Sequence, residues 1–310
     1  IMTNLKKLGL TALAGSLVAT TGYAGELGVN GTAKASYNSG DTISVTGNPY
    51  SMSTAITFSG SGELDNGMGI AVTMVTDTAS TAFSSSSLVL DMGDAGSLAL
   101  LNGMNGGYGA AAYKDKMPSA GEEVYDDMSG QDNGILSMDN SNTLAYKNSV
   151  SGVNFSVDYN PDNGFDGSSK SIGLDYAPMD GMMVFVGQSD IAAGTNDTDT
   201  HTTFGGTYTT MGATVGIQMT SIDDATAASD LDRTHIAASF AVNENLSVSY
   251  GISTVSFEAA SKTDQEDSGL GASYTMGSMS FGASLLASDN VGGTSGTDDT
   301  HKELSVAFAF

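Results

Sequence analysis

The sequence contains no cysteine among its 310 residues, which excludes disulfide bonds, thiolate zinc sites and cysteine nucleophiles. Basic residues are few, with 10 lysines and arginines against 35 acidic residues and a formal net charge of −25. A chain this acidic would repel the phosphates of a nucleic acid. We therefore expect no nucleic-acid partner and expect cations as partners instead. Proline is scarce at 4 residues, whereas glycine reaches 40, a composition typical of many strands joined by tight turns.

Catalytic motifs are missing as well. The chain has neither G-x-S-x-G nor G-x-x-x-x-G-K-[ST], and its carboxylates are too numerous to single out an acid–base pair. The histidines His201, His235 and His301 stand far apart without metal-ligand spacing, and we expect them at the surface. We therefore expect no enzymatic activity.

The first residues differ from the rest of the chain. Lys6 and Lys7 precede an apolar stretch that ends in Gly22-Tyr23-Ala24, the pattern of a secretory signal peptide with a small-residue cleavage site. We expect residues 1–24 to be cleaved, leaving 25–310 as the exported domain. No later stretch has about 18 consecutive apolar residues, so the sequence predicts no transmembrane helix.

Two-residue alternation of apolar and polar side chains recurs through the exported domain. It is clearest in residues 153–159, 171–176, 213–220, 246–252 and 269–276. In a strand this spacing sends one set of side chains to each face. Two places fit poorly: Val255 and Phe257 are out of phase with Ile252, which suggests a bulge, and both phases are apolar in 181–188.

Short and long connections alternate between these segments. The short turns lie at 65–67, 93–96, 150–152, 179–181, 211–212, 243–245 and 277–278, each with Gly or Asn suited to a tight turn. Long polar segments lie near 39–50, 79–82, 105–140, 160–168, 191–198, 223–229, 259–264 and 289–297. Seven short turns and eight long loops separate sixteen strands, each long enough to cross a bilayer. The sequence therefore predicts an all-β, antiparallel, up-and-down transmembrane β-barrel, in which the last strand pairs with the first.

Three stretches carry a resemblance to a known family. They are "SLVLDMGDAGSLALLN" at 87–102, "NTLAYKNSVSGVNFSVDYN" at 142–160 and "ELSVAFAF" at 303–310. Together with the architecture they resemble a Gram-negative general porin of the trimeric, sixteen-stranded type. The resemblance implies an outer-membrane channel, embedded in outer-membrane lipid, for passive diffusion of ions and small hydrophilic solutes. It also implies a homotrimer, a long third loop (105–140) folded into the lumen, and an assembly signal at Phe308 and Phe310 that the outer-membrane assembly machinery reads.

The 105–140 loop is strongly acidic. Its carboxylates would form a cation-attracting ring if the loop enters the lumen. We take as candidates the cluster Glu122, Glu123, Asp126 and Asp127, followed by Asp115, Asp132 and Asp139. The same residues on a solvated surface loop would carry no function.

Basic residues on the barrel wall are the second feature of the predicted pore. General porins carry an arginine cluster facing the third loop, whereas this chain has one arginine, Arg233. By alternation Lys34 and Lys147 point inward and are the candidate wall cations. With so few bases, the sequence favours a cation-preferring pore.

Calcium is a possible ligand of the same loop, although the resemblance requires no cofactor. Asp126, Asp127 and Asp132 offer hard oxygen ligands, but their spacing is not that of an EF-hand loop.

Two alternatives to a diffusion channel remain. One is a non-conducting structural or adhesive outer-membrane β-barrel, which would have large paired charges in its lumen rather than the Ser, Thr, Gly and Asn expected here. The other is a secreted calcium-binding β-solenoid, which would need a short fixed repeat that the sequence lacks.

Overall fold

The computed structural model describes residues 27–40, 48–78, 83–103, 107–114, 116–126, 142–161, 167–194, 197–226 and 229–310. The predicted signal peptide at 1–24 lies outside these residues, as do parts of several long loops. Within the described ranges there are sixteen strands and three short 3₁₀ helices.

The strands follow one another along the chain with no α-helix between them in the described residues. They are β1 (Leu27–Gly40), β2 (Tyr50–Glu63), β3 (Gly69–Asp77), β4 (Ser85–Asp91), β5 (Ser97–Asn102), β6 (Thr143–Val150), β7 (Val153–Asn160), β8 (Ser169–Tyr176), β9 (Met182–Gly194), β10 (Asp197–Thr210), β11 (Ala213–Asp223), β12 (Leu231–Ala241), β13 (Leu246–Phe257), β14 (Gln265–Met276), β15 (Met279–Asp289) and β16 (Asp299–Ala309). The 3₁₀ helices are η1 (Gly93–Ala95), η2 (Ala110–Tyr113) and η4 (Val291–Gly293).

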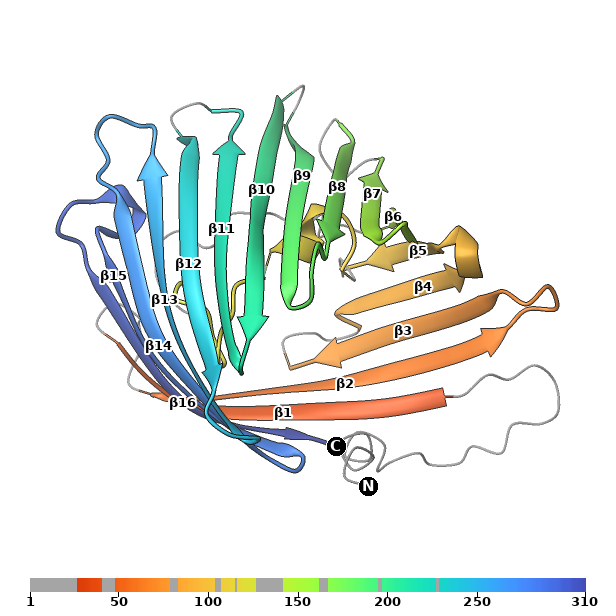
Figure 1. Ribbon diagram of the computed structural model, residues 1–310, viewed down its shortest axis with the longest axis horizontal. Coiled ribbons are helices and arrows are strands. Elements are labelled where there is room, and N and C mark those ends of the chain that lie inside the picture. Colours follow the sequence, from red (N-terminus) through yellow and green to blue (C-terminus); the bar gives the residue numbers. More distant parts are fainter. Residues whose placement is uncertain are drawn as a thin grey trace.

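The sixteen strands form one closed antiparallel barrel. Each strand pairs with its neighbours in sequence, and β1 pairs with β16 from Thr32 opposite Ala309 to Gly40 opposite His301. Figure 1 shows the wall running from red β1 through green to blue β16. Closure leaves no unpaired sheet edge, as a membrane requires. The predicted fold class is therefore confirmed.

The two faces of the wall differ in chemistry. On β12, Arg233, His235 and Ala237 are buried while Ile236 between them is 45% exposed. On β16, His301 and Glu303 are buried while Leu304 is 62% exposed. The apolar set therefore faces outward and the polar set faces the lumen, as expected of a barrel in lipid. In the described part of the chain, no helix is long and apolar enough to span a membrane.

Tight turns set the register at one end of the barrel. Ser151 and Gly152 both have positive φ, at 52° and 82°, and join β6 to β7 with no other residue between the strands. Met211 and Gly212 do the same between β10 and β11, at 48° and 81°. Positive φ at both central residues matches the right-handed twist of the flanking strands.

The bulge suggested near Val255 is absent. β13 pairs with β12 from Ser247 to Phe257 without a shift in register. Val255 points inward and has no exposed surface. An apolar side chain can occupy this inward position because other atoms of the protein cover it. Alternation alone could not distinguish this from a bulge, since both place an apolar residue out of phase.

Candidate functional site: the lumenal segment

Residues 107–114 and 116–126, called here the lumenal segment, lie along the inner face of the barrel wall. The backbone N–H of Ala110 donates to Ser171 Oγ at 2.9 Å, and that of Ala120 donates to Ser249 Oγ at 2.8 Å. Between these anchors, Gln218 Nε2 donates to the carbonyl oxygen of Tyr113 at 3.0 Å. The three wall residues lie on β8, β13 and β11, so the segment crosses several strands and is fixed to each.

Five glycines of the wall also lie against the segment. A Cβ added to any of them would lie 3.1 Å or less from an atom of the segment. These glycines, with the segment residue each one contacts, are Gly173 (Tyr113), Gly187 (Ala110), Gly216 (Met117), Gly251 (Val124) and Gly271 (Ala120). At these five positions the missing Cβ lets the segment approach the wall closely.

An aromatic stack anchors the first half of the segment. The Tyr113 ring lies parallel to that of Phe185 on β9, with centroids 5.6 Å apart and an interplanar angle of 9°. Burial raises the pKa of Tyr113, and the hydrogen bond its hydroxyl donates to Asp175 raises it further, so the phenol stays neutral. The stack also explains the doubly apolar sequence 181–188: Val184 and Val186 face outward, while Phe185 faces the segment.

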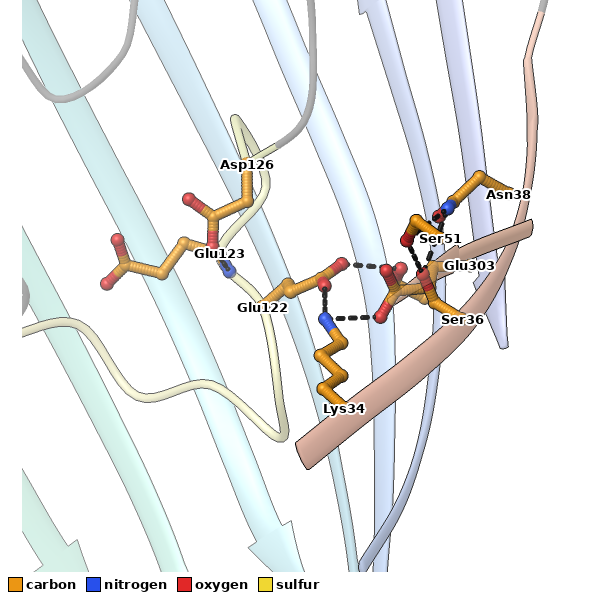
Figure 2. A network of polar contacts seen from close by, with 9 residues as sticks. Lys34, Ser36, Asn38, Ser51, Glu122, Glu123, Asp126 and Glu303 are labelled. Atoms are coloured by element: carbon orange, nitrogen blue, oxygen red, sulfur yellow. Dashed lines mark hydrogen bonds and ion pairs between the residues drawn. The ribbon is translucent and has the colours of Figure 1, made fainter. Parts of the chain in front are cut away.

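Glu122 lies in an ion-pair network that joins the segment to the seam of the barrel. Lys34 Nζ on β1 lies 3.2 Å from Glu122 Oε1 and 2.6 Å from Glu303 Oε1 on β16. Ser284 Oγ on β15 donates to Glu122 Oε2 at 2.8 Å. Figure 2 shows the two carboxyl groups on either side of the lysine.

The two carboxyl groups of this network also interact electrostatically with each other. Burial raises the pKa of Glu122, and the nearby charge of Glu303 raises it further, against the lowering effect of Lys34 and Ser284. Glu122 therefore loses its proton at a higher pH than an ordinary glutamate does.

Glu123 and Asp126 are arranged differently from Glu122. Glu123 is 8% exposed, and its carboxylate accepts a hydrogen bond from the Tyr125 hydroxyl. Its backbone N–H donates to Asp126 Oδ2 at 2.7 Å. These contacts shape the turn at the end of the segment, whereas Glu122 reaches across to β1, β15 and β16.

The remaining acidic candidates, Asp115, Asp127, Asp132 and Asp139, lie outside the described residues. Only Asp126 of the predicted calcium ligands is described. Within the described ranges, no group of three or more His, Cys, Asp or Glu side chains is arranged to hold a metal ion. The calcium site stays a prediction.

The two candidate wall lysines both contact the lumenal segment. Lys34 pairs with Glu122, as above. Lys147 on β6 places its Nζ 4.6 Å from the centroid of the Tyr108 ring. Tyr108 is itself buried against Ala99, Leu101 and Ala145 of β5 and β6. The alternation of apolar and polar residues predicted that these lysines point inward, but nothing in the sequence indicated which residues they contact.

The prediction of surface histidines is wrong. His201, His235 and His301 are all inward-facing and no more than 3% exposed. The sole arginine, Arg233, is also inward-facing and 2% exposed. Alternation carried this signal, because the exposed residues Phe204, Ile236 and Leu304 stand in the phase opposite to the histidine of each strand.

The comparisons with known proteins agree with this geometry. A family model described as Gram-negative porin matches residues 9–310. Among solved structures, one reported for the asymmetric conductivity of engineered proteins has a TM-score of 0.68 and 18% identity, covering 92% of this chain and 100% of that chain. A triple mutant of the porin from Rhodopseudomonas blastica has a TM-score of 0.66 at 18% identity, and a further refined porin structure has 0.70 at 16%, both with the same coverage. A search of curated proteins found no match.

Proposed function

Because the chain belongs to the Gram-negative porin family, we propose that it forms a water-filled channel that prefers cations and carries ions and small hydrophilic solutes by passive diffusion. The protein is an outer-membrane porin of a Gram-negative bacterium, and porins are channels rather than enzymes. Cation preference and the class of solute are the parts proposed.

The observation that carries the cation preference is the shared Lys34. Lys34 forms ion pairs with two carboxyl groups, those of Glu122 and Glu303, so one positive charge stands against two acidic groups. Once both are ionised, the network carries a net negative charge. The whole chain, with 35 acidic and 10 basic residues, supports the same sign. A low-dielectric wall strengthens the field of such charges on an ion in the lumen.

The lumenal wall beside Lys34 suits hydrophilic solutes. Lys34 pairs with Ser53 and Ser36 pairs with Ser51 across β1 and β2, so these side chains share the inner face. The Ser36 and Ser51 hydroxyls lie 2.6 Å apart, and Asn38 donates to Ser36 at 2.9 Å, as Figure 2 shows. Hydroxyl and amide groups can exchange hydrogen bonds with water and with polar solutes.

The proposal includes partners that the family suggests. A homotrimer would pack along the outer wall, and the outer-membrane assembly machinery would read the strand that ends in Phe308 and Phe310. No cofactor is required for diffusion. A calcium ion at Asp126, Asp127 and Asp132 would act as a structural ion of the loop.

The test is the reversal potential of the refolded protein in a planar bilayer across a KCl gradient. We expect stepwise conductance with cation preference, reduced in Glu122→Gln. Glu244→Gln is the matched control, because Glu244 lies in the short β12–β13 turn away from the lumenal segment. A folded barrel without conductance would favour the structural or adhesive alternative, and equal effects of both substitutions would refute the role of Glu122.

A further inference from the structure

The only arginine of the chain lies behind the lumenal segment. Arg233 projects from the inner face of β12 and is 2% exposed. Its Cζ lies 4.9 Å from the centroid of the Tyr125 ring. At this distance a guanidinium is attracted to the negative face of an aromatic ring.

Tyr125 is held firmly in this position. Its ring also meets His235 edge-on, with centroids 5.3 Å apart and an interplanar angle of 70°. Its hydroxyl donates to Glu123, and the residue is 6% exposed. The preceding residue, Val124, lies against Gly251 and Gly269 on the wall, where any side chain would collide with it.

The wall supplies a negative charge to the same site. Asp267 on β14 interacts electrostatically with Arg233 and is 2% exposed. Asp267 Oδ1 is itself fixed by hydrogen bonds from Ser288 Oγ at 2.7 Å and Gln265 Nε2 at 2.9 Å. The positive charge is thus compensated from the wall and covered by the tyrosine.

We propose that Tyr125 is a determinant of ion selectivity, because its ring separates the Arg233 charge from the ions that pass through the lumen. This inference rests on the proposed cation-preferring channel. An exposed guanidinium on the lumenal wall would repel cations and attract anions. With the ring in place, permeating cations meet the carboxyl groups near Lys34 without that opposing charge.

The first experiment measures the accessibility of Arg233 without any current. Phenylglyoxal reacts with arginine, and because the chain has one arginine, mass spectrometry of the folded barrel reports Arg233 alone. We expect no adduct in the wild type or in Tyr125→Phe, which keeps the ring, and one adduct in Tyr125→Ala. Tyr108→Ala is the matched control, since Tyr108 lies in the same segment but contacts Lys147, and it should stay unmodified. Equal modification of wild type and Tyr125→Ala would overturn the proposal.

The second experiment measures selectivity in a planar bilayer. We expect Tyr125→Ala to shift the reversal potential toward zero. Arg233→Gln is the reference for the double variant, because it removes the guanidinium that faces Asp267 while Tyr125 stays in place. Tyr125→Ala/Arg233→Gln should have the reversal potential of Arg233→Gln alone. If wild type does not conduct or does not prefer cations, the proposed function fails while the phenylglyoxal result can still stand. If wild type prefers cations and a folded Tyr125→Ala barrel has the same reversal potential, this inference fails and the proposed function stands.

A second variant covers the case in which Tyr125→Ala does not fold. Tyr125→Leu keeps an apolar side chain against the wall but offers no aromatic face to the guanidinium. We expect it to gain the phenylglyoxal adduct and to shift the reversal potential in the same direction as Tyr125→Ala. A folded Tyr125→Leu barrel with neither change would also overturn the proposal.

Discussion

The Phe310 ring lies on the α-carbon of Gly31. A Cβ at Gly31 would be 2.3 Å from Cε2 of that ring, so no other residue fits without displacing it. The backbones of the two residues also exchange hydrogen bonds: Phe310 N–H donates to the Gly31 oxygen at 2.9 Å, and Gly31 N–H donates to the Phe310 oxygen at 2.7 Å. The alternating sequence 303–310 therefore pairs with β1 up to its last side chain.

Replacing Gly31 should weaken the seam between β1 and β16. In Gly31→Val the branched side chain collides with the Phe310 ring, and we expect a loss of about 1–3 kcal/mol in the free energy of unfolding, as for other overpacked sites. Urea unfolding of the refolded barrel, followed by its gel-mobility shift, measures this. Ala35→Val is the control, because Ala35 is exposed on the same outward face of β1 and pairs with Val306. Equal losses in both variants would contradict the prediction.

Removing the Phe310 ring should impair assembly more than stability. The predicted assembly signal consists of Phe308 on β16 and Phe310 directly after it, and Phe310 is 54% exposed. We expect Phe310→Ala to lower the amount of folded barrel in the outer membrane severalfold in cells. Phe240→Ala removes an aromatic residue that is similarly exposed, 47%, from β12 and should leave the amount near wild type. A similar fall in both variants would point to lost apolar contact with lipid and not to a signal.

The cation preference should depend on pH through Glu122. Because burial raises its pKa, Glu122 is protonated and uncharged at pH values where an ordinary glutamate is already ionised. Its negative charge therefore appears only as the pH rises above the raised pKa, and cation preference should rise with it. Reversal potentials measured from pH 4 to pH 8 should show a step in wild type that is absent in Glu122→Gln. If the two titration curves have the same shape, another acid controls the pH dependence.

The fold was predictable from the sequence because a barrel strand has few degrees of freedom. Alternation fixes which side chain faces lipid, and turn residues such as Gly152 and Gly212 fix where strands reverse. The failures are local. Phe185 and Val255 are apolar yet inward because something packs on them, and alternation cannot detect a packing partner from another part of the chain.

The site was less predictable, since its contacts join residues far apart in sequence. Lys34 and Glu122 are 88 residues apart, and only the path of the lumenal segment brings them together. Alternation placed Lys34 inward, and charge density singled out Glu122, but Glu123 beside it is covered by the fold of the segment. The histidines show the opposite failure. The alternation of their strands placed them inward, whereas the lack of metal-ligand spacing, from which surface exposure was predicted, carries no information about burial.

The position of the lumenal segment should depend on the glycines beneath it. In Gly251→Ala the new Cβ would lie 2.7 Å from Val124 Cγ1, so the Val124 side chain must shift and disturb the segment that carries it. We expect an altered single-channel conductance and a loss of about 1–3 kcal/mol in the free energy of unfolding. Val124→Ala removes the colliding methyl groups, so the double variant Gly251→Ala/Val124→Ala should return the conductance toward wild type. Non-additive rescue would show that Gly251 acts through Val124, whereas simple addition of the two single effects would show that the wall glycine affects the barrel by some other route.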